Sequence, residues 1–229
     1  MPDMPVDVQG GAPGRRPASP LRRISRIAAV VAVAMGMLLL GEAAWQLWGT
    51  GIATAQAQHR LGAQFAATVA ASDPTTTKRA DAADTVPSAA GVAPAPLGSV
   101  VGHLVIPRIG VNDYVVEGTG SSQLAEGPGH YVGTAPIGRA GNVGIAGHRT
   151  THGAPFYNLN LLQAGDLIYL TDRSGRTYTY RVEAQFVVAP SDGSVLLTTS
   201  TPTLTLTTCN PRYWASQRLI VRASLVTTA

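Results

Sequence analysis

The stretch Thr203-Leu-Thr-Leu-Thr-Thr-Cys-Asn-Pro-Arg-Tyr-Trp-Ala-Ser-Gln-Arg-Leu-Ile-Val-Arg222 decides the fold and holds the only cysteine of the chain, Cys209. Leucine alternates with threonine before the cysteine, and this period of two predicts a strand. Asn210-Pro211 ends that strand, because proline has no N–H to donate to a neighbour. A second β-rich run, residues 217–226, follows at once. The stretch therefore predicts a hairpin with Cys209 at the end of its first strand.

Arg218 begins the second strand of this hairpin, nine residues after Cys209. Pairing of the two strands brings the guanidinium near the sulfur. A cation there increases the thiolate fraction or stabilises negative charge on a substrate carbonyl oxygen. The hairpin therefore favours covalent catalysis by Cys209. The alternative is a small buried hydrophobic side chain, a common role for a lone cysteine in a strand.

Chain length, net charge and cysteine content limit the classes of protein to which this sequence can belong. The 229 residues allow one domain with tails. The net charge is +4, but no single basic patch forms: arginines cluster only near the N-terminus, at Arg15, Arg16, Arg22, Arg23 and Arg26. Nucleic-acid binding is therefore not expected. One cysteine excludes an internal disulfide.

The N-terminal region predicts a membrane anchor. Residues 1–23 are rich in proline, glycine and arginine, and we expect a disordered cytoplasmic tail. Residues 24–48 are apolar and long enough to cross about 30 Å of hydrocarbon, with Trp45 and Trp48 at the interface. The N-terminal arginines, of which Arg26 is the last, precede the wholly apolar run at 27–40, so the C-terminal bulk is expected outside the cell. A cleaved signal peptide is the competing interpretation, but the apolar run is long for one.

The remainder divides into an extracellular linker, residues 49–98, and a folded domain, residues 99–229. The linker is rich in alanine, proline and threonine, with a possible helix at 53–71. The domain alternates short strands with turns, which predicts an all-β barrel or sandwich. Short helices are expected near 121–126 and 156–162. The predicted strands are 100–106, 112–116, 142–146, 167–171, 176–188, 204–208 and 218–226.

A second stretch with chemical potential follows the strand at 142–146. That strand stops at Gly147, and His148 stands just past its end, where catalytic groups often lie. The alternative is a histidine that only hydrogen-bonds its loop. His148 and His152 could form a metal pair, but no carboxylate cluster or second cysteine nearby completes a zinc site, so no metal is expected. His130 follows a Gly-Pro-Gly turn and either lines the cleft or holds the turn.

The combination of Thr-Leu-Thr-Thr-Cys209-Asn-Pro, Arg218 and the upstream Gly-His148-Arg-Thr-Thr resembles the sortases, membrane-anchored cysteine transpeptidases of Gram-positive bacteria. Gly-Pro-Gly-His130-Tyr and Gly-His148-Arg-Thr-Thr-His-Gly-Ala-Pro-Phe156 are similar to the class E branch of actinobacteria. The resemblance covers about residues 97–229 and the anchor. It implies an eight-stranded sortase-type β-barrel with short helices and no cofactor.

The resemblance also implies a reaction. A surface protein with a sorting signal of the LAXTG or LPXTG type would be cleaved between Thr and Gly. Its acyl group would pass to a peptidoglycan amine, or to a pilin. Cys209 would attack as the thiolate and carry the thioacyl intermediate. His148 would protonate the leaving amine and deprotonate the incoming one, and Arg218 would stabilise the oxyanion.

Three further residues are expected to contact the substrate, namely Thr208, Tyr131 and His130. Two alternatives to the transpeptidase stay open. One is a cysteine hydrolase on the same barrel, which releases the acyl group to water. The other is a non-catalytic, membrane-tethered β module that binds wall polymer.

Overall fold

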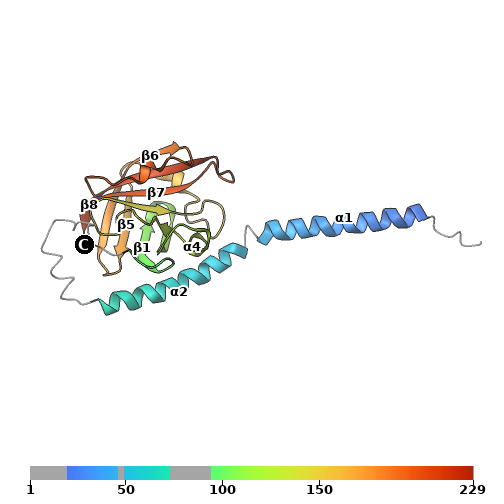
Figure 1. Ribbon diagram of the computed structural model, residues 1–229, viewed down its shortest axis with the longest axis horizontal. Coiled ribbons are helices and arrows are strands. Elements are labelled where there is room, and N and C mark those ends of the chain that lie inside the picture. Colours follow the sequence, from blue (N-terminus) through green and yellow to red (C-terminus); the bar gives the residue numbers. More distant parts are fainter. Residues whose placement is uncertain (1–19, 46–48, 73–93, 229) are drawn as a thin grey trace, which may run out of the picture. The chain divides into compact units, whose positions relative to one another are not determined.

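The computed structural model describes residues 20–45, 49–72 and 94–228. The chain divides after Ala43 into two compact units, each described here by itself. The expected cytoplasmic tail falls mostly outside the described residues, as do Trp48 and residues 73–93 of the predicted linker. Figure 1 shows the order of the elements along the chain.

The described part of the first unit belongs to one long helix, α1, Pro20–Ala44. Its segment Ile24–Ala44 has a mean hydropathy of 2.2, and none of its most apolar window is buried. By length and composition, this segment can cross a membrane. The helix coincides with most of the predicted anchor at 24–48, which supports the prediction of one membrane-crossing segment there.

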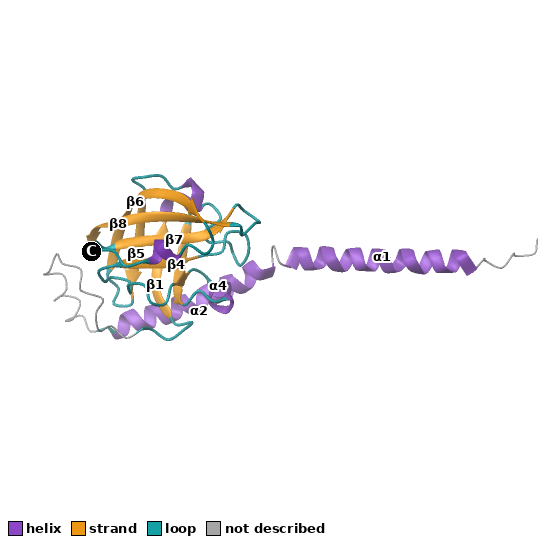
Figure 2. Ribbon diagram, turned by 45° about the horizontal axis from the view of Figure 1, so that its top comes forward, coloured by secondary structure: helices purple, strands orange, loops and turns teal. Residues whose placement is uncertain are grey.

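The second unit is built around a closed barrel in the strand order β1-β2-β3-β4-β7-β8-β6-β5 (Figure 2). The pairs β2–β3 and β4–β7 are parallel, and the other neighbouring strands are antiparallel. The prediction of an eight-stranded β-barrel with short helices is confirmed. Its strands are β1 Val100–Ile106, β2 Val111–Glu117, β3 Gly129–His130, β4 Asn142–Ala146, β5 Leu167–Asp172, β6 Thr177–Val188, β7 Thr203–Asn210 and β8 Gln217–Thr228.

Short helical segments connect these strands. The predicted helix at 121–126 is present as α4, Ser121–Glu126. The one expected at 156–162 is reduced to a single 3₁₀ turn, η3, Leu159–Leu161. Two further 3₁₀ turns are η2, Pro107–Ile109, and η4, Gly193–Leu196.

Strict alternation of side chains fills the barrel. On β7, Leu204 and Leu206 are fully buried in the main core. The residues between them face the other side of the sheet, because successive side chains of a strand point to opposite faces. The neighbouring strands β4 and β8 follow the same rule with the core residues Val143, Ile145, Leu219, Val221 and Ala223. The other side of β4, β7 and β8 is separate from this core, although Asn142, Thr205 and Thr207 on it are also buried.

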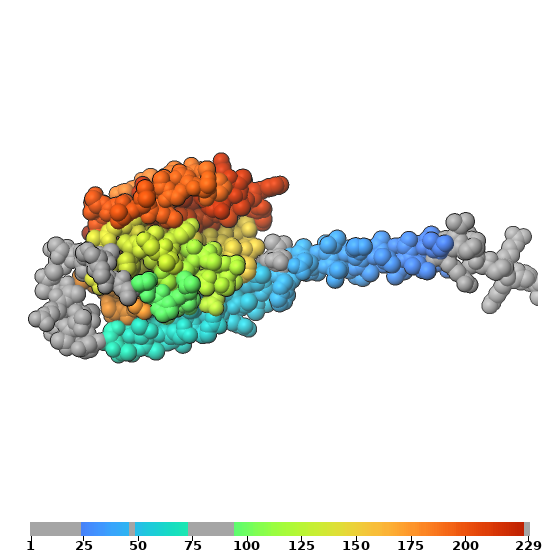
Figure 3. Space-filling view, viewed as in Figure 1, coloured from blue at the N-terminus to red at the C-terminus, as the bar shows by residue number. Residues whose placement is uncertain are grey.

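Helix α2, Thr50–Ala71, packs against the outside of this barrel. Leu61 and Phe65 form a second apolar cluster with Val100 and Val116. Figure 3 shows the cyan to teal atoms of α2 lying against the green atoms of the first strands. Within the linker predicted over residues 49–98, the first part therefore lies against the barrel. The helix expected there is present, but it belongs to the folded unit, which begins at Ala44.

The side chain of Gln58 attaches α2 to β2 and to the end of α4 by hydrogen bonds. Its amide donates to the carbonyl oxygens of Tyr114 (3.0 Å) and Glu126 (2.8 Å). Its oxygen accepts the N–H of Tyr114 (2.6 Å). Three hydrogen bonds from one amide fix both the rotation and the height of the helix on the barrel, because each has a narrow range of lengths and angles.

Candidate active site

Cys209 and Arg218 are directly opposed in the antiparallel ladder of β7 and β8. Opposed residues in such a ladder project to the same face, with their Cβ atoms about 5 Å apart. Cys209 is a free thiol of intermediate exposure, and β7 ends one residue beyond it. The hairpin predicted from the sequence therefore exists, and its register pairs the sulfur-bearing residue with the predicted arginine.

His148 reaches the same level through the parallel ladder of β4 and β7. That ladder runs from Asn142↔Thr203 to Ala146↔Thr207, and the same register continued two residues further sets His148 opposite Cys209. Two hydrogen bonds around Gly147 continue the attachment past the last ladder pair. The N–H of Gly147 donates to the oxygen of Thr207 (3.1 Å), and the Thr208 hydroxyl donates to the oxygen of Gly147 (2.8 Å).

The alternation of the three strands sets the face on which these residues lie. On β4, β7 and β8 the core residues are Val143 and Ile145, Leu204 and Leu206, and Leu219 and Val221. By alternation, Cys209 and Arg218 lie on the outer face of the barrel wall. His148 falls on the same face by continuation of β4. The candidate site is therefore a surface over β4, β7 and β8 rather than the barrel interior.

The loop that carries His148 is closed by Phe156. The N–H of Phe156 donates to the oxygen of His148 (3.1 Å), and its ring is fully buried. This ring lies on the backbone of Gly147, where an added Cβ would come within 2.6 Å of a ring carbon. Gly147 is thus required for the close approach. The loop turns through His152 (φ 53°) and Ala154 (φ 47°), both in the left-handed region.

The pKa of His148 is lowered from its ordinary value. Partial burial is the larger cause, and the neighbouring His152 is the smaller. The two rings stack with their centroids 4.7 Å apart and their planes at 23°. Burial and a like charge both disfavour the imidazolium. The imidazolium form is therefore scarcer at neutral pH than for an exposed histidine.

Arg149 connects the histidine loop to the end of β7, and the sequence analysis did not single it out. Its Nη1 donates to the oxygen of Cys209 (3.1 Å) and to Oδ1 of Asn210 (2.7 Å). Its Nη2 donates to Oδ1 of Asn160 (3.0 Å). The side chain is 6% exposed. The only available signal was its position next to His148, which does not reveal long-range partners.

Three arginines follow Cys209 in the chain, and their contacts differ. Arg212 lies over the ring of Tyr157 at 4.1 Å, and Arg222 donates to the oxygen of Val195 (3.3 Å). Arg218 donates through Nη1 to the oxygens of Ala215 (3.1 Å), in the loop that joins β7 to β8, and of Gln217 (3.0 Å), the first residue of β8. Of the three, Arg218 is the one paired with Cys209, as the sequence analysis selected.

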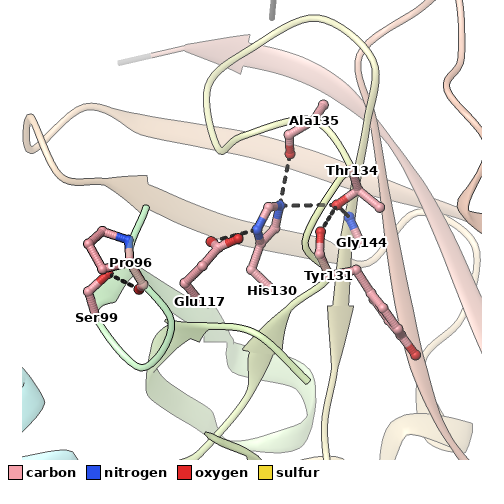
Figure 4. A network of polar contacts seen from close by, with 8 residues as sticks. All are labelled: Pro96, Ser99, Glu117, His130, Tyr131, Thr134, Ala135 and Gly144. Atoms are coloured by element: carbon pink, nitrogen blue, oxygen red, sulfur yellow. Dashed lines mark hydrogen bonds and ion pairs between the residues drawn. The ribbon is translucent and has the colours of Figure 1, made fainter. Parts of the chain in front are cut away.

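Tyr131 lies where a substrate contact was expected. Its hydroxyl hydrogen-bonds that of Thr207 (2.9 Å), which stands two residues before Cys209 on the outer face of β7. Figure 4 shows its ring extending away from the neighbouring polar network. Thr208 differs, because its side chain is 3% exposed and its hydroxyl is engaged with Gly147. Thr208 therefore holds the histidine loop rather than a substrate.

His130 is likewise placed in the interior, with 4% exposure. Its Nδ1 lies 2.9 Å from a carboxylate oxygen of Glu117, and its Nε2 lies 3.0 Å from the oxygen of Ala135 (Figure 4). Thr134 links this pair to Gly144 on β4 by accepting its N–H (3.2 Å). Both ring nitrogens are engaged within the protein, which corrects the expected substrate contact. His130 supports the turn that carries Tyr131.

Metal ligands do not gather at the site. Across residues 20–45, 49–72 and 94–228, no group of three or more His, Cys, Asp or Glu residues is placed to hold a metal ion. The chemistry on this surface is that of a thiol, an imidazole and a guanidinium.

A closed eight-stranded barrel with a free cysteine opposite an arginine on adjacent strands defines a recognisable class of protein. A sequence model of the sortase domain matches residues 104–226. The chain belongs to the sortase family.

Individual relatives agree with this assignment. The chain is 31% identical over 237 aligned positions to sortase SrtE1 of Streptomyces coelicolor, covering 96% of this chain and 62% of the relative. The structure of sortase E from Streptomyces avermitilis matches with a TM-score of 0.54 and 38% identity, over 59% of this chain and 93% of that one. A Clostridium perfringens sortase D5 transpeptidase matches with a TM-score of 0.58 and 27% identity, over 76% and 99%.

The matches cover only part of the length of these curated relatives. The chain spans 62% of SrtE1 and 66% of sortase D from Bacillus subtilis. The class E character expected from the motifs agrees with the two Streptomyces matches.

Proposed function

We propose that this protein is a membrane-anchored cysteine transpeptidase. It would cleave a sorting signal of the LAXTG or LPXTG type between Thr and Gly and transfer the acyl group to a cell-wall amine. One observation supports the proposal above all: β7 and β8 pair Cys209 with Arg218, and the β4–β7 register, continued two residues past the end of β4, sets His148 opposite Cys209.

The two half-reactions use the same pair of side chains. The Cys209 thiolate attacks the Thr carbonyl carbon, and the tetrahedral intermediate collapses as the His148 imidazolium protonates the leaving glycine nitrogen. This leaves a thioester on Cys209 and a neutral imidazole. An incoming amine then attacks the thioester and gives its proton to His148. The new amide departs, and the thiolate is regenerated.

Arg218 would stabilise the oxyanion in both steps. A guanidinium has five N–H donors, and its Nη1 is already fixed by the carbonyls of Ala215 and Gln217. Such fixing preorganises the cation, so little reorganisation is needed when negative charge develops on the substrate oxygen.

The lowered pKa of His148 has a kinetic consequence in this scheme. Catalysis requires the thiolate and the imidazolium together. A histidine that resists protonation lowers the population of this pair near neutral pH.

Two side chains lie over the outer face of β4 at Gly144, namely Tyr131 and Leu196 of η4. A Cβ at Gly144 would meet them at 3.1 and 2.9 Å. We assign the second residue of the signal to the region of Tyr131, where its size would be read.

The location follows from α1. We propose that Ile24–Ala44 spans the membrane once, with the arginine-rich N-terminus in the cytoplasm and the barrel outside. The partners would then be surface proteins that carry the signal and the amine of a peptidoglycan precursor.

Product analysis tests this function. The full chain is incubated with peptides that differ only at the second signal position, with and without an added amine, and the products are identified by mass spectrometry. We expect a thioester on Cys209, an amide product that depends on the amine, and a rate that depends on the second residue. Hydrolysis alone at every amine concentration would instead identify a cysteine hydrolase.

A labelling experiment separates the enzyme from a non-catalytic wall-binding module. A peptidyl vinyl sulfone should modify Cys209 and block turnover, with Cys209→Ala as the matched control. Wall binding that is unchanged in Cys209→Ala, without any labelling of the wild type, would support the module.

A further inference from the structure

His152 lies against the candidate catalytic histidine in an unusual conformation. Its backbone is left-handed (φ 53°), which few residues other than glycine adopt without cost. This conformation turns its ring onto that of His148, at 4.7 Å and 23°. The Nδ1 atom of His152 is buried without a hydrogen-bond partner within the described residues. Backbone geometry and stacking, rather than a hydrogen bond through Nδ1, therefore orient this ring.

The beginning of α2 contacts the same loop. The N–H of His152 donates to the hydroxyl of Thr50, the first residue of α2, at 3.2 Å. One turn later the buried Thr54 faces Gly153, where an added Cβ would lie 3.5 Å from the Thr54 methyl group. The Thr54 hydroxyl donates in addition to the oxygen of Ala125 (2.8 Å) at the end of α4. The first turn of α2 is thus seated between α4 and the histidine loop.

We propose that His152 is a positioning residue for His148 and that Thr50, in the first turn of α2, holds His152 in its stacked place. The proposal rests on the function proposed above, in which His148 must gain and lose a proton in each cycle. It makes the helix that follows the candidate membrane span part of the catalytic architecture. Without this contact, α2 would only determine the distance between the candidate membrane span and the barrel.

The groups around His148 determine how strongly its contact with His152 affects its pKa. Its own loop supplies His152 and Arg149, and β7 supplies Cys209. From α2, the contacting residues Thr50, Gly51 and Thr54 carry no charge. Arg149 is engaged with the end of β7, and after burial the electrostatic effect of His152 is the second cause that lowers the pKa of His148. Removing the stacked ring both exposes His148 and removes the like charge.

The test is a histidine titration of the full chain in lipid nanodiscs. The five histidines are labelled with ¹³C, and the His148 signal is assigned by its loss in His148→Gln. The titration midpoint of His148 is then compared in the wild type, His152→Asn, Thr50→Val and Thr68→Val. Asparagine tolerates a positive φ, so His152→Asn removes the ring without adding backbone strain. Thr68 is the matched control, because its hydroxyl donates to Gln64 within α2 itself.

We expect the midpoint to rise in His152→Asn, to rise less in Thr50→Val, and to stay unchanged in Thr68→Val. An unchanged or lowered midpoint in His152→Asn overturns the positioning role. A Thr50→Val midpoint equal to that of Thr68→Val overturns the part assigned to α2.

A second readout separates this proposal from the proposed function. The pH profile of kcat/KM for the peptide reaction should move in the same direction as the midpoint. If the midpoint moves but no variant, including the wild type, forms a thioester, then the histidine pair stands and the transpeptidase assignment fails. If a thioester forms but the His148 midpoint is unchanged in His152→Asn, the transpeptidase assignment stands and the positioning role of His152 fails.

Discussion

Cys209 and Arg218 are held by a regular ladder, whereas His148 is held by a loop. The ladder residues owe their positions to the register of β7 and β8 over eight pairs. The histidine depends on a few specific contacts: the glycine under Phe156, the ring of His152 and the guanidinium of Arg149. Register is robust, because a slip would turn every buried leucine outward. Substitutions in the loop around His148 should therefore displace the histidine. Substitutions of Cys209 or Arg218 in the β7–β8 ladder should instead remove a reacting group and leave the backbone in place.

The largest effect is expected for Cys209→Ala, which removes the nucleophile and leaves the ladder intact. We expect kcat/KM to fall on the order of 10⁴-fold or more, because the remaining groups cannot form the acyl intermediate. Thermal unfolding should stay close to that of the wild type, since Cys209 is only partly buried. Activity within tenfold of the wild type would remove the cysteine from the mechanism.

Arg218→Gln should come next, with a loss of about 10²–10³-fold in kcat, the usual cost of one oxyanion donor. Arg222→Gln is the matched control, since Arg222 lies on the same face of β8 but bonds to Val195. Steady-state kinetics of both variants measure the difference. Equal losses would mean that charge on this face matters and that the pairing with Cys209 does not.

Arg149→Met tests the connection between the two sides. It leaves the oxygens of Cys209 and Asn210 without their charged donor, whereas Asn160 keeps Arg212 as a donor, and we expect about 2–4 kcal/mol lower stability. Arg149→Lys should recover part of this loss, because lysine supplies a charge without the planar fork. Urea unfolding measures both variants. A loss in Arg149→Met as small as that of an exposed substitution would show that the connection is dispensable.

Gly147→Ala acts on the loop side alone. The new Cβ would lie 2.6 Å from the buried Phe156 ring, so we expect about 1–3 kcal/mol of destabilisation and a displaced His148. Gly193→Ala is the control, because nothing lies within 4 Å of a Cβ at that position. Thermal unfolding and kcat/KM should both separate the two variants, and identical behaviour would contradict the packing argument.

The same contrast explains what the sequence could predict. The alternation of leucine and threonine before Cys209 identified β7, and the spacing to Arg218 identified the hairpin. Periodicity needs several residues, so β3, with only Gly129–His130, escaped detection. The docking of α2 depends on Leu61 and Phe65 meeting strands far along the chain, and an alanine-rich segment gave no sign of it.

The substrate contacts show a signal that was present but not used. Thr208 shares the parity of Leu204 and Leu206, which already places its side chain on the buried face. The role of His130 could not be read in this way, because its partner Glu117 lies on another strand. The catalytic assignments of Cys209, His148 and Arg218 stay predictions that the variants above address.

The smallest effect is expected in the pH dependence of stability. The folded-state pKa of His148 lies below its unfolded value of about 6.5, so the unfolded chain binds the proton more readily. Its contribution to stability is therefore present above that pH and is lost as the pH falls through the folded pKa. His148→Asn should flatten the decline of Tm on acidification, whereas the exposed His59→Asn should not. If Tm falls as steeply with pH in His148→Asn as in the wild type, the loop accepts the charged imidazolium without loss of stability. The His148 loop would then tolerate change as well as the β7–β8 ladder does.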